Sequence, residues 1–347
     1  MKSWNEGGTM RRVLNVYGPG DVRLDSATLP DVGPNDALIN IRACAICGSD
    51  LNYIRSGILN MGSESPKPLG HEAAGVVIEV GSEVEGIEPG MHVIINPMIA
   101  DGVIGNGSDE GAFTDRLMVR GAQCNVTLYP MPEGMDFEVA ALAEPLAVSL
   151  HGVNRGRVKP GDRAVVFGVG PIGLGIVLCL KHRGLTNIVS VDLSASRLER
   201  ARALGATATI SAEHGNVRER LAELHGQEHT RFGEAVGTDV YFDAAGAPNI
   251  IPDIIDMAKP DSRLVMNALY SQPVEINLVS FLIREMHFTS AVGYPTEFPE
   301  VIAILAEHGE EARRMISHRL ALDDIMDALD IARSPTCGKV IITFPHD

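Results

Sequence analysis

Two cysteines stand three positions apart in ACAICGSDLNY, residues 43–53. A Cys-x-x-Cys pair supplies half of many four-ligand zinc sites, and the same spacing occurs in dithiol redox motifs. No second Cys-x-x-Cys follows in the chain. Cys44 and Cys47 are therefore half of an incomplete zinc-binding motif, a redox pair, or one metal ligand beside a cysteine without a metal role.

A histidine and a glutamate further along offer the other ligands of a catalytic zinc site, which uses three protein ligands and keeps a fourth position open. His71 follows Cys47 by 24 residues in PLGHEAAG. Glu144 lies in ALAEPLAVS, where the apolar neighbours give no other reason for a carboxylate. Spacing alone leaves two interpretations open: a zinc site on Cys47, His71 and Glu144, or a structural histidine near glycines.

VVFGVGPIG contains three glycines in the G-x-G-x-x-G spacing, which is a weak signal in a chain with 36 glycines. Here the glycines close an apolar strand and open a helix, where free N–H groups and the helix dipole hold a pyrophosphate. Gly168 suits the tight turn, Gly170 the approach of the phosphate, and Gly173 close helix–strand packing. The cofactor-binding residues predicted in this loop are Gly168, Gly170, Pro171, Ile172 and Gly173.

Asp192 ends the next predicted strand, 24 residues after Gly168. A carboxylate there accepts hydrogen bonds from the adenosine ribose and repels a 2′-phosphate, so the sequence favours NAD over NADP. Arg197 follows closely and either weakens that preference or covers the adenine. An incidental glycine turn in an α/β domain is the alternative to this dinucleotide site.

Two regions of the chain with different secondary-structure patterns must position these residues. Residues 10–120 contain short strands bounded by Gly, Pro, Asn and Asp, such as DALINIRACAI and AAGVVIEVGSEV, which indicate a β-barrel-like domain. From residue 162, DRAVVF, GVGPIGLGIVLCLKHRG, NIVSV and DLSASRLERARALGA alternate strand and helix. TDVYFDAAG and RLVMNAL are later strands, VIAILAEHG a helix and GKVIITF a terminal strand. The prediction is an α/β fold with a parallel sheet.

Composition limits the partners. The 347 residues suffice for two domains. Lys plus Arg number 29 against 45 Asp plus Glu, and this net charge of −16 argues against nucleic acid or an anionic membrane as partner. Five cysteines without a disulfide framework and a polar N-terminus predict a cytoplasmic protein without a signal peptide. Residues 1–9 are expected to be an extension.

GHEAAGVVIEVGSEV, residues 70–84, matches the pattern G-H-E-x2-G-x5-G-x2-V at every fixed position. CGSD, GHE, EPL, the glycine loop and the final GKVIITF also follow in the order found in medium-chain zinc-dependent alcohol dehydrogenases. Over residues 10–343 the chain resembles this family, in the branch of the sorbitol, butanediol and threonine dehydrogenases. In that branch the third zinc ligand is a carboxylate, whereas the animal and plant alcohol dehydrogenases of the family use a cysteine.

The resemblance implies one catalytic zinc on Cys47, His71 and either Glu144 or Glu72. It implies that Asp50 fixes the His71 ring, which leaves Cys44 as a buried small hydrophobe. The family's second, structural zinc is not expected, because residues 96–115 contain no cysteine.

The same resemblance places Ser49 to take the alcohol proton and Tyr53 beside the substrate. It puts NALYS and SAVGY around the nicotinamide and a basic residue against the pyrophosphate. The residues assigned to the cofactor in this way are Ala268, Leu269, Val292 and Lys339.

Two positions depart from the family pattern. Many members have histidine where this chain has Asn52, and asparagine cannot relay a proton near neutral pH, so water or another group must. Polyol dehydrogenases carry an arginine at the position aligned with Gly293, where glycine cannot grip sugar hydroxyls. The glycine at position 293 therefore weakens the case for polyol oxidation and favours a smaller or more apolar secondary alcohol.

The resemblance also implies the domain order. A GroES-like zinc-binding catalytic domain would comprise residues 1–150 and 294–347, and a doubly wound Rossmann domain that binds NAD residues 151–293, with the active cleft at their junction. Zinc would lower the pKa of a secondary alcohol, whose alkoxide gives hydride to nicotinamide and leaves a ketone. A homodimer or homotetramer is expected. The alternatives are a zinc-free double-bond reductase of the same superfamily and a non-catalytic nucleotide-binding protein.

Overall fold

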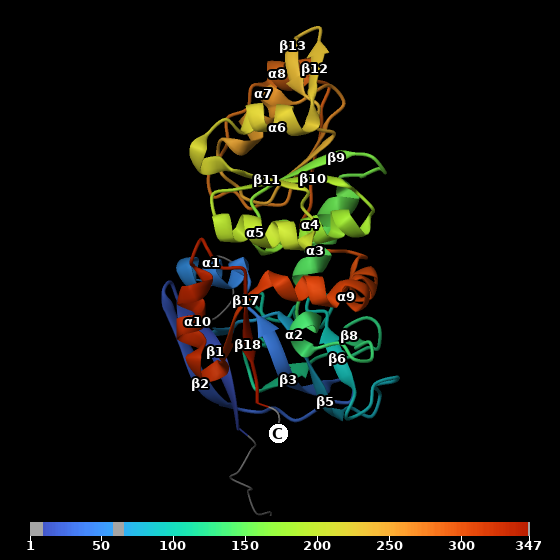
Figure 1. Ribbon diagram of the computed structural model, residues 1–347. Coiled ribbons are helices and arrows are strands. Elements are labelled where there is room, and N and C mark those ends of the chain that lie inside the picture. Colours follow the sequence, from blue (N-terminus) through green and yellow to red (C-terminus); the bar gives the residue numbers. More distant parts are fainter. Residues whose placement is uncertain (1–9, 58–65, 346–347) are drawn as a thin grey trace, which may run out of the picture. The chain divides into compact units, whose positions relative to one another are not determined.

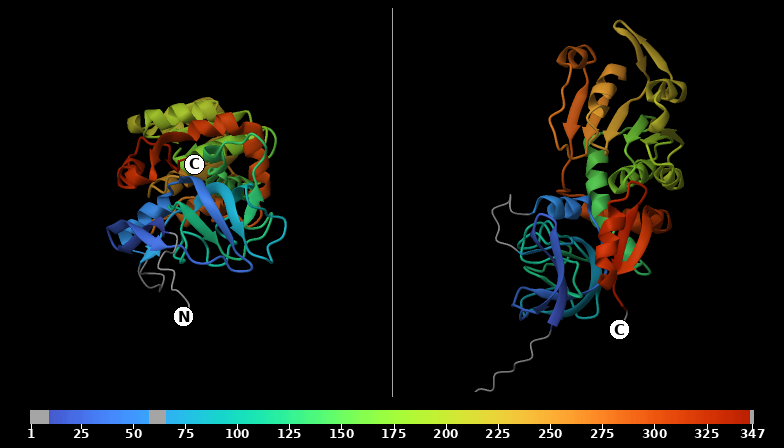
Figure 2. Two further views of the ribbon diagram at one scale, coloured as in Figure 1. Left: turned by 90° about the horizontal axis from the view of Figure 1, so that it is seen from below. Right: turned by 90° about the vertical axis from the view of Figure 1, so that its left-hand side faces the viewer.

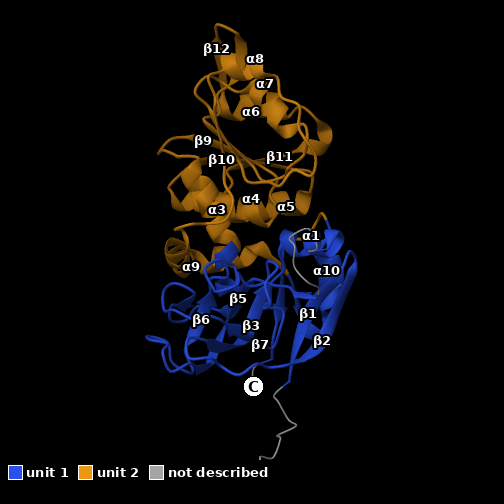
Figure 3. Ribbon diagram, turned by 180° about the vertical axis from the view of Figure 1, so that it is seen from behind, with its two compact units in different colours: residues 1–144, 318–334, 339–347 blue, residues 145–317, 335–338 orange. Residues whose placement is uncertain are grey.

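A computed structural model describes residues 10–57 and 66–345 (Figure 1), so the extension expected at residues 1–9 lies outside the described residues. The chain divides into two compact units, coloured in Figure 3. Unit 1 comprises residues 1–144, 318–334 and 339–347, and unit 2 comprises residues 145–317 and 335–338. Among the described helices none has the length and apolar character that crossing a membrane requires.

Unit 1 is built mainly from antiparallel strands, seen from two further directions in Figure 2. One sheet has the strand order β17-β18-β3-β5-β6-β8, with β7 also paired to β3, and a smaller sheet has the order β2-β1-β4. The strands are β1 (Met10–Gly18), β2 (Asp21–Thr28), β3 (Ala37–Ala45), β4 (Lys67–Pro68), β5 (Glu72–Val80), β6 (His92–Ile95), β7 (Arg116–Val119), β8 (Leu128–Pro130), β17 (Ile316–Ala321) and β18 (Lys339–Thr343). The helical elements are α1 (Gly48–Ser56), α2 (Phe137–Ala140), η4 (Leu322–Asp324) and α10 (Ile325–Ala332).

The interior of unit 1 holds the apolar side of these strands. Ile39, Ile41, Val93, Ile95 and Leu117 are at most 1% exposed and belong to one hydrophobic cluster. Strands β3, β5, β6 and β7 are buried over most of their length, so the short strands that the sequence predicted form the core of this domain.

Unit 2 contains a six-stranded, fully parallel sheet with the strand order β11-β10-β9-β14-β15-β16. These strands are β9 (Arg163–Phe167), β10 (Asn187–Asp192), β11 (Ala208–Ser211), β14 (Val240–Asp243), β15 (Arg263–Met266) and β16 (His287–Ser290). The order reverses between β9 and β14, which is the point where doubly wound sheets bind ligands.

Helices cover both faces of the parallel sheet. Figure 1 shows α4 and α5 on one face, with α6 and α7 on the other. The helical elements are α3 (Ala143–Arg155, which begins in unit 1), α4 (Pro171–His182), α5 (Ala195–Leu204), η2 (Ala212–His214), α6 (Val217–His225), α7 (Ile250–Met257), α8 (Leu278–Ile283), α9 (Phe298–Ala312) and η3 (Arg313–Met315). A hairpin of β12 (Gln227–Thr230) and β13 (Gly233–Val236) lies outside the sheet.

The compact units divide the chain at other points than the predicted domains, which meet at 150/151 and 293/294. Residues 294–317 group with unit 2 because α9 packs against α4 and α5. The functional domain boundaries stay a prediction, since compactness measures packing and not which residues share a reaction.

Candidate active site

Cys47, His71 and Glu72 bring one sulfur, one imidazole nitrogen and one carboxylate oxygen within 4.8 Å of one another. Strand pairing explains the convergence: β3 and β5 are antiparallel, with Ala45 opposite Glu72. The end of β3 therefore lies beside the start of β5, although 24 residues separate Cys47 from His71. Cys47 is the N-cap of α1, so its side chain sits where the chain leaves the sheet.

Asp50 ties the two segments together. Its carboxylate accepts hydrogen bonds from the backbone N–H of Cys47 (2.9 Å) and of Gly70 (3.3 Å), and it is fully buried. His71 Nδ1 lies 3.6 Å from Asp50 Oδ1, too far for a hydrogen bond but close enough for electrostatic attraction. Asp50 thus faces one ring nitrogen of His71 and leaves the other for a metal.

Lys339 forms a buried ion pair with Glu72, with Nζ 2.6 Å from Oε1 and exposures of 2% and 0%. Lys339 starts β18, which pairs with β3 on the side opposite β5, and so β3 brings both residues to one place. Burial lowers the pKa of Lys339, but the negative charges of Glu72, Cys47 and Glu144 outweigh burial and raise it overall. The structure thus gives this lysine a partner in the metal site, and its predicted contact with the pyrophosphate stays a prediction.

Of the two carboxylates left open as third ligand, the structure puts Glu72 beside Cys47 and His71. Glu144 is buried near Lys339, but among the described residues it does not join the group whose donor atoms lie within 4.8 Å. The assignment of either carboxylate as a ligand remains a prediction.

Exchanging each carboxylate for its amide separates these two assignments. We expect Glu72→Gln to weaken zinc binding by at least about 100-fold, because a neutral amide is a poorer ligand than a carboxylate. Glu144→Gln should keep its zinc after dialysis against a competing chelator. Zinc loss from the second variant and retention by the first would reverse the assignment.

The residues present fit a zinc ion. The donor set of thiolate, imidazole and carboxylate is one that zinc accepts. Glu72 Oε2 and Ser49 Oγ are buried polar atoms without a hydrogen-bond partner among the described residues. Buried polar atoms normally have partners, and a metal ion with its bound oxygen would supply them.

Cys44 occupies the core of unit 1 rather than the metal group. It is fully buried within β3 and belongs to the hydrophobic cluster. Burial raises the pKa of its thiol well above the usual range, so it stays neutral. A buried neutral thiol is neither a metal ligand nor a redox nucleophile.

Helix α1 also carries the residues assigned to the substrate. Tyr53 is half-buried, and its hydroxyl donates to Asn106 Oδ1 at 3.2 Å, which ties the helix to the loop of residues 96–111. The exposed Asn52 accepts a hydrogen bond from Arg55 through Oδ1 at 2.8 Å. The sequence did not indicate Asn106 as a partner of Tyr53, because the contact is long-range.

The glycine loop of unit 2 joins β9 to α4, as predicted. Gly168 has φ +78°, and a Cβ there would lie 2.6 Å from the Ala245 side chain. A Cβ on Gly173 would lie 1.9 Å from the carbonyl oxygen of Gly168, so helix and strand are closer than any side chain permits. Gly170 caps α4, whose first residue is Pro171. Ile172 follows in the first turn.

Asp192 and Arg197 lie beside this loop. Asp192 ends β10, and its carboxylate accepts hydrogen bonds from Val169 N and Ser194 N, both at 2.8 Å. Arg197 donates from Nε to the carbonyl of Cys337 at 3.0 Å, and its Nη1 lies 3.8 Å from the Cβ position of Gly170. The structure therefore groups these predicted cofactor residues around one loop.

Exposed apolar side chains follow the next parallel strands at the same edge of the sheet. Leu269 after β15 is 84% exposed and Val292 after β16 is 82% exposed, and Ala268 precedes the former. The sequence missed the buried Asp243 at the end of β14, whose Oδ1 accepts from the backbone N–H groups of Ala245 and Gly246, both at 3.0 Å. It thereby shapes the turn against which Gly168 packs.

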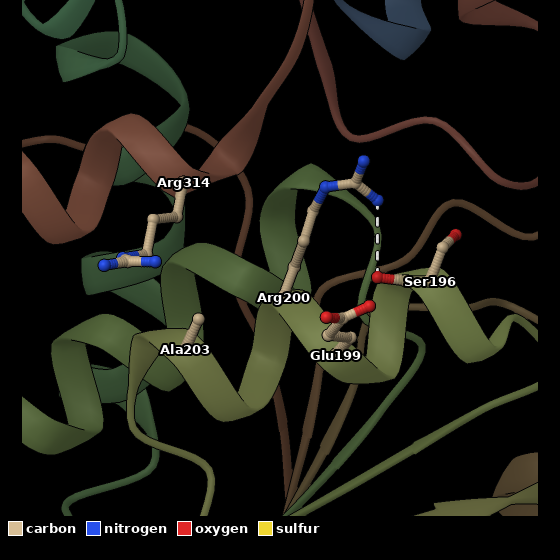
Figure 4. A pocket seen from close by; sticks show the side chains of 5 residues that line it. All are labelled: Ser196, Glu199, Arg200, Ala203 and Arg314. Atoms are coloured by element: carbon tan, nitrogen blue, oxygen red, sulfur yellow. Dashed lines mark hydrogen bonds between the residues drawn. The ribbon is translucent and has the colours of Figure 1, made fainter.

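A separate pocket lies on α5 and η3 and is lined by Ser196, Glu199, Arg200, Ala203 and Arg314 (Figure 4). Arg200 donates from Nη1 to the carbonyl of Ser196 at 3.3 Å. No predicted site residue lines this pocket, so it is distinct from the glycine loop.

Two family models match the chain. One described as an alcohol dehydrogenase GroES-like domain matches residues 33–137, and one described as a zinc-binding dehydrogenase matches residues 171–307.

Relatives match over nearly the whole length. Sorbitol dehydrogenase of Mus musculus is 31% identical over 347 residues, covering 95% of this chain and 94% of that protein. (R,R)-butanediol dehydrogenase of Bacillus subtilis is 30% identical over 329 residues, covering 88% and 91%. The crystal structure of 2R,3R-butanediol dehydrogenase from Bacillus subtilis superposes with a TM-score of 0.85 at 26% identity, covering 96% and 100%. These matches confirm the predicted fold class.

Proposed function

The chain belongs to the zinc-dependent medium-chain alcohol dehydrogenases, in the branch of the sorbitol and butanediol dehydrogenases, and on this premise we propose its substrate and mechanism. The substrate is a secondary alcohol, a diol, polyol or similar, which the enzyme oxidises to a ketone or forms in the reverse direction. Zinc and NAD are its cofactors.

The observation that carries the mechanism is the convergence of Cys47, His71 and Glu72 on one point. These residues would hold zinc, which supplies Lewis-acid polarisation of a substrate oxygen and lowers the pKa of its hydroxyl. Asp50 orients His71 from the Nδ1 side of its ring, and Lys339 balances the charge of Glu72. A zinc-free reductase of the superfamily would have no use for this donor set, so that alternative is not favoured.

Ser49 is the residue proposed to take the alcohol proton. Its Oγ is buried and has no hydrogen-bond partner among the described residues, so it is free to exchange a proton with substrate. It follows Cys47 by two residues at the start of α1, which keeps it close to the metal group. Asn52 cannot relay the proton onward by changing its own protonation state, so water carries it from there.

Two features set the substrate class. Tyr53 and Asn106 present a hydrogen-bonded pair beside the first turns of α1. Gly293 brings no side chain where polyol dehydrogenases have arginine, and the space around its Cβ position is open. We therefore favour a compact diol or 2-alkanol over a sugar alcohol.

The carboxylate of Asp192 is proposed to select NAD over NADP. We expect Asp192→Asn to raise the NADP/NAD ratio of kcat/KM by roughly tenfold, because the amide keeps an acceptor for Val169 N while losing the charge that repels a 2′-phosphate. Asp192→Ala should raise NADP use as well, but with weaker binding of both cofactors. An unchanged ratio in both variants would show that the ribose anchor lies elsewhere.

One experiment tests the function itself. NAD reduction is followed against diols, polyols, hydroxy amino acids and 2-alkanols, with zinc measured in wild type and Cys47→Ser. Turnover together with the loss of one zinc per chain in the variant supports the proposal. A difference of one zinc without turnover on any alcohol favours the non-catalytic alternative. We further propose a cytoplasmic homodimer or homotetramer, which sedimentation of the purified chain tests.

A further inference from the structure

A second group of metal-ligand side chains lies in unit 2, on α4 and α9. His182 is the last residue of α4, and Glu307 and His308 are consecutive residues of α9. One donor atom from each lies within 4.8 Å of the others. His182 and His308 are mostly buried, with side chains 24% and 15% exposed, whereas Glu307 is 63% exposed.

The distances within this group suit a tetrahedral ion. His182 Nδ1 lies 3.3 Å from His308 Nε2, and each nitrogen lies 3.6 Å from an oxygen of Glu307. Two zinc–nitrogen bonds of about 2.0–2.1 Å at a tetrahedral angle put the nitrogens about 3.3 Å apart. His182 faces Oε2 of Glu307 and His308 faces Oε1, and the exposed carboxylate can turn to bind an ion through one or both oxygens.

The backbone of α9 makes the convergence possible. Consecutive residues of a regular helix point in different directions and do not share a ligand. His308 departs from helical geometry, with φ −117° and ψ 26°. This kink turns Glu307 and His308 toward the same imidazole of α4.

The surrounding charges leave the group open to a cation. Glu311 Oε1 lies 3.9 Å from His308 Nδ1, the ring nitrogen away from His182, which is too far for a hydrogen bond but close enough for electrostatic attraction. Lys181 Nζ forms an ion pair with Glu311 Oε1 at 3.4 Å, and Arg183 Nη1 forms one with Glu300 Oε1 at 2.6 Å. Both neighbouring cations are therefore neutralised by their own partners.

We propose that His182, Glu307 and His308 form a second divalent-metal site, for zinc or a similar late first-row ion, which joins the end of α4 to α9. Two imidazoles and one carboxylate are a known ligand set for zinc, with the fourth position left to water. The site is independent of the catalytic group, because its three residues lie in unit 2 and the catalytic group lies in unit 1. Its effect is to stabilise unit 2.

Cobalt titration of the chelator-treated full chain tests this site, because Co²⁺ reports its ligands by absorption. The catalytic group contains a thiolate and gives a sulfur-to-cobalt charge-transfer band, whereas the proposed site gives only ligand-field bands. We expect two Co²⁺ per chain in wild type. Cys47→Ser should keep one ion without the charge-transfer band, and His182→Gln/His308→Gln should keep one ion with it.

Stability supplies an independent readout. In the Cys47→Ser background, added Zn²⁺ should raise the melting temperature of the chain, and His182→Gln/His308→Gln should abolish that rise. His229→Gln is the matched control, because His229 contacts Glu234 at 2.7 Å but belongs to no metal-ligand group among the described residues. A Cys47→Ser variant that binds no Co²⁺ and gains no stability from Zn²⁺ would overturn the proposal.

Discussion

Replacing Cys47 by serine should abolish zinc binding at the catalytic group and lower kcat/KM by at least about 10³-fold. The substitution removes the thiolate, the strongest anionic donor of the three, and leaves His71 and Glu72 as a two-ligand site. Loss of Lewis-acid activation costs several kcal/mol of transition-state stabilisation, and about 4 kcal/mol corresponds to 10³-fold. Zinc content and alcohol-dependent NAD reduction are measured on the same preparation.

Cys44→Ala is the control that the chain itself provides. Cys44 lies three residues away but is fully buried in the core of β3. We expect this variant to keep zinc and activity and to lose only about 1 kcal/mol of stability, since one sulfur atom leaves the core. Equal losses of zinc in the two variants would refute the assignment of a single ligand. Full activity of Cys47→Ser would remove the basis of the proposed mechanism.

The parts of the fold with strong local patterns were predictable from the sequence. The apolar runs that became β9 and β10, and the glycine loop between β9 and α4, carry their own strand, turn and helix signals. β16 (HFTS) escaped prediction because it is a short edge strand without an apolar run, and three of its four residues are exposed. The hairpin of β12 and β13 is likewise mostly polar.

The candidate site was only partly predictable because long-range pairing builds it. Residue types and family motifs pointed to Cys47 and His71, but the choice between Glu72 and Glu144 depends on the register of β3 against β5. The pairing of Lys339 with Glu72 spans 267 positions and leaves no local signal. The same holds for His182 and His308, which only the packing of α4 against α9 brings together.

The ion pair of Glu72 and Lys339 leads to the second large expected effect. Lys339→Met should destabilise the zinc-depleted protein by about 3–5 kcal/mol, because removing one partner leaves a buried charge without compensation. Both side chains are at most 2% exposed, so solvent cannot take over the role of the lost ammonium. Chemical denaturation after exhaustive chelation measures the effect.

Lys259→Met is the matched control for the loss of a lysine ion pair. Lys259 contacts Asp239 at 2.6 Å and Glu228 at 3.0 Å, but these partners are 21% and 42% exposed. Water screens the remaining charges there, and we expect a loss of about 1 kcal/mol or less. The contrast between the two variants isolates the contribution of burial from that of the ion pair itself.

Zinc should reduce the cost of Lys339→Met, and this dependence distinguishes a lysine of the metal site from a lysine that only supports the fold. A divalent ion held by Cys47, His71 and Glu72 would compensate the carboxylate that Lys339 balances in the apo protein. The double variant Lys339→Met/Glu72→Gln should recover part of the stability without zinc, because it removes both charges. If zinc leaves the cost of Lys339→Met unchanged and the double variant recovers nothing, then Glu72 is not the carboxylate that faces the metal.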